Sequence, residues 1–167
     1  MRVGQGFDVH PWSDDPENRL VLGGVEIPGH RGLDGHSDSD AIAHACTDAV
    51  LGAIGLGDIG QLFPDTDASL AGADSIGLLT EAMVAVRHAG WDVANIDCTI
   101  VLDEPKIAPI RPEMERNLAA AVGAPVAVKG KRTEGLSALA DGVQCFAVAL
   151  LYRSEQDRDP QLEDEER

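Results

Sequence analysis

Three side chains in two separate segments have the types and spacing of a metal site. Asp8 and His10 are two residues apart near the start of the chain, and His44 lies in a helix-like stretch further along. One carboxylate and two imidazoles suit zinc or a similar first-row ion. Three protein ligands leave a fourth position free for water or substrate, as in catalytic zinc sites. Each residue alone is more common in a strand-end loop or on a helix surface, but together they predict a metal-dependent enzyme.

Two further segments carry groups that could bind phosphate. His36-Ser37 precedes the same helix-like stretch, and helix N-terminal amides with a hydroxyl can hold an anion, although simple capping by Ser37 explains the pattern equally well. Residues 129–134, Lys-Gly-Lys-Arg-Thr-Glu, offer three cations, a hydroxyl and a carboxylate. These groups could hold a diphosphate with a magnesium-type ion, and the alternative is a charged surface turn.

The hydrophobic pattern indicates which elements must position these residues. Residues 2–9 alternate weakly and predict a strand, in which side chains two apart share a face. Asp8 and His10, at the end of this strand, can therefore point at one ion. Ser37 or Asp38 can cap a helix that ends near residue 54, just before Gly55.

The predicted helix has one polar face. Ser37, Asp40, His44 and Asp48 fall at spacings of three and four residues, which places them on the same side. His44 thus projects from a polar stripe on a helix otherwise made of small apolar residues. Asp40 or Asp48 could orient an imidazole from behind, and the alternative is a solvated helix acid.

The rest of the chain predicts a mixed fold. The expected elements are a hairpin at 20–27, an exposed loop at 58–73, helices at about 75–89 and 108–122, and strands at 93–102, 126–128 and 143–152. This order indicates an α+β protein, in which helices pack on one face of a mixed β-sheet. Residues 1–153 are expected to form a single domain. The acidic segment 154–167 is nearly free of apolar residues and is expected to be a disordered tail.

Composition limits the classes of partner. The chain has 167 residues and a formal net charge of −16, which argues against nucleic acid as a ligand but not against a small anion held by a metal. Three widely spaced cysteines, Cys46, Cys98 and Cys145, predict buried reduced thiols. No targeting segment or membrane-spanning run is evident, so a soluble cytoplasmic protein without membrane partners is expected.

The motifs resemble one family closely, the 2-C-methyl-D-erythritol 2,4-cyclodiphosphate synthases of the non-mevalonate isoprenoid pathway. The resemblance runs from Arg2 to about Tyr152. The matching segments are Gly6-Phe7-Asp8-Val9-His10, His36-Ser37-Asp38 with His44, residues 56–67 (Leu-Gly-Asp-Ile-Gly-Gln-Leu-Phe-Pro-Asp-Thr-Asp), Gly72-Ala73-Asp74-Ser75, Pro105-Lys106, Thr133-Glu134 and Ala147-Val148-Ala149-Leu150-Leu151.

The resemblance implies both an assembly and a reaction. It implies a homotrimer with active sites between neighbouring subunits, and a divalent metal, usually zinc, held by Asp8, His10 and His44. The implied substrate is 4-diphosphocytidyl-2-C-methyl-D-erythritol 2-phosphate, whose 2-phosphate attacks the β-phosphorus. The products are CMP and the cyclic diphosphate. Positioning and charge neutralisation would supply most of the acceleration of such a step.

By the same resemblance, the substrate-binding residues come from two subunits. One subunit would hold the phosphates and the methylerythritol end with Asp8, Val9, His10, His36, Ser37, Asp58, Ile59, Gly60, Phe63, Pro64, Asp65, Thr66 and Asp67. The adjoining subunit would bind cytosine with Leu102, Asp103, Glu104, Pro105, Lys106, Ile107 and Ala108, and the diphosphate with Lys131, Arg132, Thr133 and Glu134. His36, Arg132 and Thr133 are the expected catalytic residues. Glu134 would contact a magnesium or manganese ion on the diphosphate.

Two departures from the family pattern stand out. Lys131-Arg132 replaces consecutive threonines, and we hypothesise that the Arg132 guanidinium takes over transition-state stabilisation. Residues 136–142 replace and shorten a glycine-rich segment whose arginine, in many relatives, binds isoprenoid diphosphates on the trimer axis. We therefore expect no such ligand to bind here.

Two other functions fit the residues alone. A zinc-dependent phosphoesterase would use metal-bound hydroxide and release inorganic phosphate or a linear product. A trimeric metal- or nucleotide-binding module would bind CMP without turnover and tolerate the loss of His36.

Overall fold

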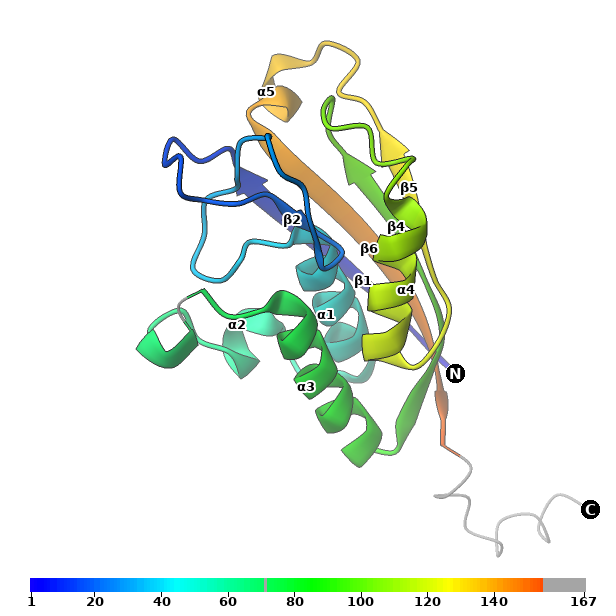
Figure 1. The fold of residues 1–167 in the computed structure, drawn as a ribbon. Coiled ribbons are helices and arrows are strands. Elements are labelled where there is room, and N and C mark those ends of the chain that lie inside the picture. The colour runs from blue at the N-terminus through cyan, green and yellow to red at the C-terminus, as the bar shows by residue number, and fades with distance from the viewer. Residues whose placement is uncertain (71, 155–167) are drawn as a thin grey trace, which may run out of the picture.

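The computed structural model describes residues 1–70 and 72–154 (Figure 1). Their elements, in chain order, are β1 (Arg2–Pro11), β2 (Val21–Leu22), β3 (Val25–Glu26), α1 (Ala41–Ile54), α2 (Ile59–Leu62), the 3₁₀ helix η1 (Ala68–Leu70), α3 (Ser75–His88), β4 (Trp91–Val101), α4 (Arg111–Val122), β5 (Val126–Lys131), α5 (Ser137–Ala140) and β6 (Gly142–Arg153). The predicted acidic tail lies, apart from Ser154, outside the described residues.

A four-stranded mixed sheet is the framework of the fold. Its strand order is β1–β6–β4–β5, with β6 antiparallel to β1 and β4, and β5 parallel to β4. The helices α1, α3 and α4 lie on one side of this sheet, and the short hairpin β2–β3 lies beside them (Figure 1). The predicted α+β arrangement is confirmed.

Helix α1 packs unusually closely on strand β1. Burial along β1 alternates, and Gly4 and Gly6 face the helix while Gln5 between them is exposed. A Cβ atom built on Gly6 would lie 1.9 Å from the carbonyl oxygen of Ala45, and one on Gly4 would lie 1.9 Å from that of Ala49. Only glycine permits this backbone-to-backbone approach. The helix therefore lies directly over the strand that carries Asp8.

The start of α1 differs from the prediction. The helix begins at Ala41, and Asp40 is its N-cap, because its carboxylate accepts hydrogen bonds from the amides of Ile42 and Ala43 at 3.1 and 3.2 Å. The same carboxylate accepts the amides of Gly23 and Gly24 at 2.9 and 2.6 Å. Asp40 is fully buried, and this burial raises its pKa to about 6, although hydrogen bonds from the amides of Gly23, Gly24 and Ala43 oppose the shift. It thus joins the hairpin turn to α1 and does not share the polar face of the helix.

Other boundaries were predicted less well. The stretch expected to be a loop at 58–73 contains α2 and η1, and α5 lies within the shortened segment 136–142. β5 extends through Lys131, because Lys129 and Lys131 pair in register with Thr99 and Val101 of β4. The three cysteines are free and buried, as expected.

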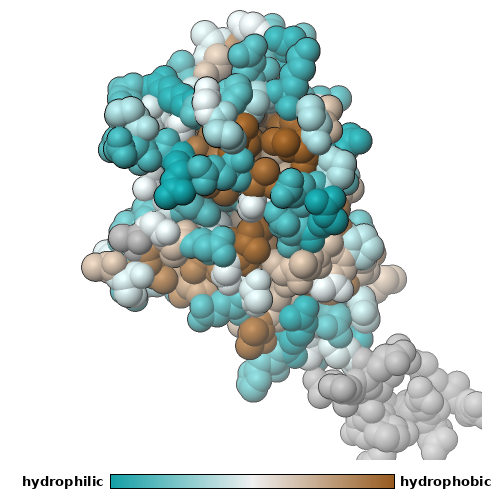
Figure 2. Space-filling model, in the orientation of Figure 1, coloured by the Kyte–Doolittle hydropathy of each residue, from teal (hydrophilic) through white to brown (hydrophobic). Residues whose placement is uncertain are grey.

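The sheet face opposite the helices is apolar and exposed. Its large side chains on β1 and β6 are between 41% and 67% accessible; they are Val3, Phe7, Val9, Phe146, Val148 and Tyr152. The rings of Phe7 and Phe146 are 4.8 Å apart. On the helix side the surface is largely hydrophilic, with apolar residues visible in a hollow between the loops (Figure 2). Among the described residues, no helix combines the length and apolarity needed to cross a membrane.

Candidate metal centre and substrate pockets

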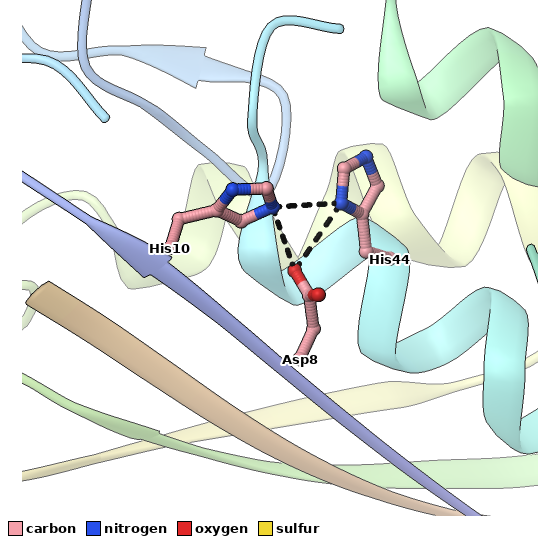
Figure 3. Close-up of side chains that lie close together, drawn as sticks. All are labelled: Asp8, His10 and His44. Carbon is pink, nitrogen blue, oxygen red and sulfur yellow. Dashed lines mark hydrogen bonds and ion pairs between the residues drawn. The ribbon is translucent and has the colours of Figure 1, made fainter. Parts of the chain in front are cut away.

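The three predicted metal ligands converge. Asp8 and His10 project from the end of β1 and His44 from the first turns of α1, and all three point toward one another (Figure 3). Asp8 Oδ2 lies 3.0 Å from His10 Nε2 and 3.2 Å from His44 Nδ1, and these two nitrogens are 3.1 Å apart. Within the described part of the chain, this is the one group of three or more such side chains close enough to share an ion.

The geometry fits a tetrahedral zinc ion. Ligand atoms about 2.0–2.1 Å from zinc in a tetrahedral site lie about 3.3 Å from one another. The observed separations of 3.0–3.2 Å match one triangular face of such a tetrahedron. Among the His, Cys, Asp and Glu side chains of the described residues, no fourth joins the group, which is the composition expected for a site that also binds water or substrate.

The second nitrogen of each histidine also has a partner. His10 Nδ1 donates to the backbone carbonyl oxygen of Asp34 at 2.8 Å, so in the neutral ring Nε2 presents its lone pair to the cluster. His44 Nε2 lies 2.9 Å from the hydroxyl of Ser75 and 3.0 Å from that of Ser37. Such partners orient metal-ligating imidazoles and fix their tautomers.

The electrostatics of the cluster favour a cation. Burial alone would raise the pKa of Asp8, but hydrogen bonds and charge attraction from His10 and His44 hold it well below its ordinary value. Burial would lower the pKa of His10, but the hydrogen bond to Asp8 and its negative charge raise it above the ordinary value. Asp8 is therefore held ionised, and its negative charge stabilises positive charge where the three side chains meet.

A pocket of about 310 Å³ opens beside the cluster. Its lining combines polar groups near the metal ligands with apolar side chains from α2, η1 and α3. The lining residues are His10, His36, Ser37, His44, Ile59, Gly60, Phe63, Asp65, Leu70 and Leu78. The structure thus gathers eight predicted site residues, from four separate segments, around one space.

A second pocket, of about 270 Å³, lies at the end of β4 and β5. It is lined by Leu102, Asp103, Pro105, Lys106, Ile107, Ala108, Arg111, Gly130, Lys131 and Arg132. The segments expected to bind cytosine and diphosphate therefore adjoin one another. This pocket shares no lining residue with the first, so one chain presents the two halves of the predicted site as separate surfaces.

Some predicted residues serve local structure. Asp58 caps α2, since its carboxylate accepts the amide of Gln61 at 2.8 Å. Asp67 accepts the amide and hydroxyl of Ser69. Val9 faces the sheet side opposite to the metal cluster. Pro64, Thr66 and Glu104 belong to the predicted segments but line neither pocket.

Asp103 holds the segment that carries Arg132 and Thr133. Its carboxylate accepts the amide and hydroxyl of Thr133 at 3.2 and 2.5 Å and faces Arg132 Nε at 3.4 Å. The Thr133 hydroxyl, followed by its amide and Arg132, lowers the pKa of Asp103 although desolvation opposes the shift. Thr133 is almost fully buried, while the Arg132 side chain is 68% exposed and free to turn toward a ligand. Glu134, with a positive φ of 54°, follows at the surface.

The carboxylate behind the histidines was predicted wrongly. Asp40 caps α1 and binds the hairpin, and Asp48 accepts the amide of Ile59 at 2.8 Å. The acid that reaches a metal-ligating imidazole is Asp38, through the hydroxyl of Ser75. Ser75 was expected at a helix start and within a segment that matches the family, but no contact with His44 was predicted, since no spacing rule relates the two residues.

Proteins with a similar sequence or structure belong to the family that the motifs resemble. The profile of the YgbB family matches residues 1–152. The 2-C-methyl-D-erythritol 2,4-cyclodiphosphate synthase of Aromatoleum aromaticum is 54% identical over 158 residues, covering 92% of this chain and 94% of that protein. A CDP-bound structure of a 2C-methyl-D-erythritol-2,4-cyclodiphosphate synthase is 40% identical with a TM-score of 0.82, covering 90% of this chain and 100% of the other. The bifunctional IspDF of Campylobacter jejuni is 39% identical with a TM-score of 0.85, covering 94% of this chain but 43% of that one.

Proposed function

The chain belongs to the YgbB family, and we propose that it catalyses the reaction for which its relatives are named, the formation of 2-C-methyl-D-erythritol 2,4-cyclodiphosphate. In 4-diphosphocytidyl-2-C-methyl-D-erythritol 2-phosphate, an oxygen of the 2-phosphate attacks the β-phosphorus of the same molecule. The bond between this phosphorus and the oxygen that bridges to the α-phosphorus breaks, and CMP leaves with that oxygen. The protein is thus a phosphorus–oxygen lyase of isoprenoid precursor synthesis.

The observation that carries this function is the convergence of Asp8, His10 and His44 at the edge of the 310 Å³ pocket. An intramolecular attack needs little covalent help, because nucleophile and electrophile belong to one substrate. The protein must fold the substrate so that its phosphates lie in line, and must neutralise their charge. A cation site beside a pocket that is part polar and part apolar serves both needs.

We propose zinc for the position between the three ligands. Bound there, the ion would neutralise negative charge on the phosphates and hold a phosphate oxygen at its free vertex. His36 and Ser37, which line the same pocket, would bind the phosphates from the other side. Phe63 and Ile59 would cover the methylerythritol carbons, with Asp58 toward its hydroxyls.

The second pocket supports a cytidine diphosphate site. A relative with the same fold has been solved with CDP, which shares its cytidine and diphosphate with the proposed substrate. Residues 102–108 would contact the base through backbone groups, while Lys131 and Arg132 would neutralise the diphosphate. Glu134 would hold a magnesium or manganese ion on the α and β phosphates. The cytoplasmic location stays a prediction.

A homotrimer would complete this site. The two pockets lie apart on one chain, so a neighbouring subunit must bring its second pocket to the first. The exposed apolar face of β1 and β6 is the surface that such an assembly would cover, since large exposed apolar patches mark interaction sites. Active sites between subunits follow from this arrangement.

Val148→Asp should dissociate the trimer. Val148 lies on β6 within the apolar face and is 47% exposed in the single chain, so a carboxylate there would be buried without a partner on assembly. Sedimentation velocity should then give one chain mass instead of three, with loss of turnover. Val84→Asp, on the exposed side of α3, is the matched control and should remain trimeric. A trimeric Val148→Asp protein would refute this interface.

Arg132→Ala should lower kcat by about 10²-fold, because one charged donor to the transferring phosphoryl group is lost. The ion pair with Asp103 is exposed and contributes little to stability, so the fold should not change. Arg132→Lys should recover part of the rate. Arg116→Ala, an exposed arginine of α4 outside both pockets, is the control. Full turnover by Arg132→Ala would exclude the role.

Phosphorus NMR of the reaction mixture tests the function itself. The purified protein with zinc, magnesium and substrate should give the cyclic diphosphate and CMP in equal amounts. Inorganic phosphate or a linear product would identify a phosphoesterase. CMP binding without product would identify a binding module.

A further inference from the structure

The outward nitrogen of His44 has two candidate partners. Its Nδ1 faces Asp8 and His10, while Nε2 lies 2.9 Å from the Ser75 hydroxyl and 3.0 Å from the Ser37 hydroxyl. The two serine oxygens are 3.3 Å apart. A hydroxyl can donate or accept, so the partners of each serine decide which of them fixes the imidazole.

Ser75 has its proton committed elsewhere. Its hydroxyl donates to Asp38 Oδ1, and its backbone amide donates to Asp38 Oδ2 at 3.2 Å. An ionised carboxylate only accepts, so the hydroxyl proton points at Asp38 and the oxygen lone pairs remain for His44. The Ser75 oxygen must therefore accept a hydrogen bond from the Nε2–H group of His44. The consequence is a single tautomer, in which Nε2 is protonated and Nδ1 presents its lone pair to the cluster.

Ser37 is placed differently. It is partly exposed and lines the substrate pocket, whereas Ser75 is fully buried at the start of α3. The Ser37 oxygen accepts a hydrogen bond from the amide of Ser39 at 3.2 Å, and within residues 1–70 and 72–154 no carboxylate accepts a hydrogen bond from its hydroxyl. Its hydroxyl can thus turn toward a bound phosphate without changing the state of His44.

We propose that Ser75, held by Asp38, is a positioning residue for the metal centre, which it serves by fixing the tautomer and ring orientation of His44. The carbonyl of Asp34 does the same for His10. Hydrogen-bond partners of this kind strengthen metal binding by about 10–100-fold. The inference rests on the proposed zinc site. It assigns Ser75 to the orientation of the His44 imidazole and Ser37 to the binding of a substrate phosphate.

Paired alanine variants test this assignment. Ser75→Ala and Ser37→Ala each remove one hydroxyl beside the same nitrogen. Competition of the trimeric protein with a chelator for zinc should give an affinity about 10–100-fold lower for Ser75→Ala. Ser37→Ala should stay within about 3-fold of the unsubstituted protein and affect KM or kcat instead. Equal zinc affinities in the two variants, or a larger loss in Ser37→Ala, would overturn the proposal.

A second readout does not depend on zinc. Two-bond ¹H–¹⁵N spectra of the metal-free protein, at a pH where His44 is neutral, distinguish the two ring tautomers. The unsubstituted protein and Ser37→Ala should show His44 protonated at Nε2, and Ser75→Ala should show a mixture. An unchanged tautomer in Ser75→Ala would refute the proposal, whereas failure of the unsubstituted protein to bind zinc would refute the metal site alone.

If Ser75→Ala does not fold, the variant Asp38→Asn tests the same role of Ser75. The asparagine amide can donate to the Ser75 oxygen, which would turn the hydroxyl proton toward Nε2 and favour the opposite tautomer. The same 10–100-fold loss of zinc affinity is expected. Zinc affinity equal to that of the unsubstituted protein would exclude the relay from Asp38 through Ser75 to His44.

Discussion

Replacing His44 with alanine should remove zinc from the purified protein and lower kcat/KM for the cyclisation by about 10³-fold. Two ligands, Asp8 and His10, would remain on β1, and two ligands do not make a tight zinc site. The substrate phosphates would then meet the Asp8 carboxylate without a neutralising cation. Metal analysis and a steady-state assay on the same preparation measure both effects.

The control for His44→Ala is the replacement of a histidine that lies outside the site. His88, exposed at the end of α3, should be replaceable by alanine with full zinc content and turnover. Asp8→Asn keeps the shape of a ligand but removes its charge, so it should also lose zinc without a change of fold. If His44→Ala keeps one zinc per chain and full activity, the metal centre is located elsewhere.

Gly6→Ala should destabilise the protein by about 3 kcal/mol and also weaken zinc binding. The added methyl would need the space of the Ala45 carbonyl oxygen, which lies 1.9 Å from the Cβ position. Since that atom is helix backbone, α1 as a whole must move away from β1. His44 precedes Ala45, so the same movement would separate it from Asp8. Urea denaturation at fixed protein concentration and a zinc competition assay measure the two losses.

Gly52→Ala is the matched control on the same helix. A Cβ there would lie 4.0 Å from its nearest neighbour, the carbonyl oxygen of Gln5. Replacing an unhindered helical glycine with alanine raises helix propensity, so stability should rise by about 0.5–1 kcal/mol. If Gly6→Ala is as stable as Gly52→Ala, the close approach of α1 and β1 does not hold the ligands together.

The convergence of Asp8, His10 and His44 was predictable in part, because the face on which each side chain lies follows from local periodicity. Alternation in a strand places Asp8 and His10 on one face, and the structure confirms that both lie on the helix-covered side of β1. Helical spacing placed His44 on a polar stripe. Gly4 and Gly6 allow the helix to approach the strand. Their role depends on tertiary contacts, which the hydrophobic period of the sequence does not reveal.

The remaining errors have physical causes as well. Asp40 was expected on the polar face of the helix, either orienting an imidazole or solvated, but it is buried and accepts the amides of the distant hairpin turn as well as those of the first turn of α1. α2 and α5 have four residues each, too few to show a helical period. The Ser75 hydroxyl reaches His44 from α3, a contact between helices that only tertiary packing creates. Family resemblance, not spacing, indicated residues 58–67 and 102–108 as site segments.

The buried Asp40 carboxylate has a consequence for how this chain can vary. By binding both the hairpin turn and the first turn of α1, it anchors the two ends of an excursion whose far end, Pro28 to His30, is exposed. Insertions or deletions at Pro28 to His30 would change the length of this connection, while the hydrogen bonds of Asp40 to the hairpin turn and to α1 stay in place. Pro28 to His30 is thus a place where a change of loop length, or a grafted reporter tag, should leave Asp40 and both of its attachments intact.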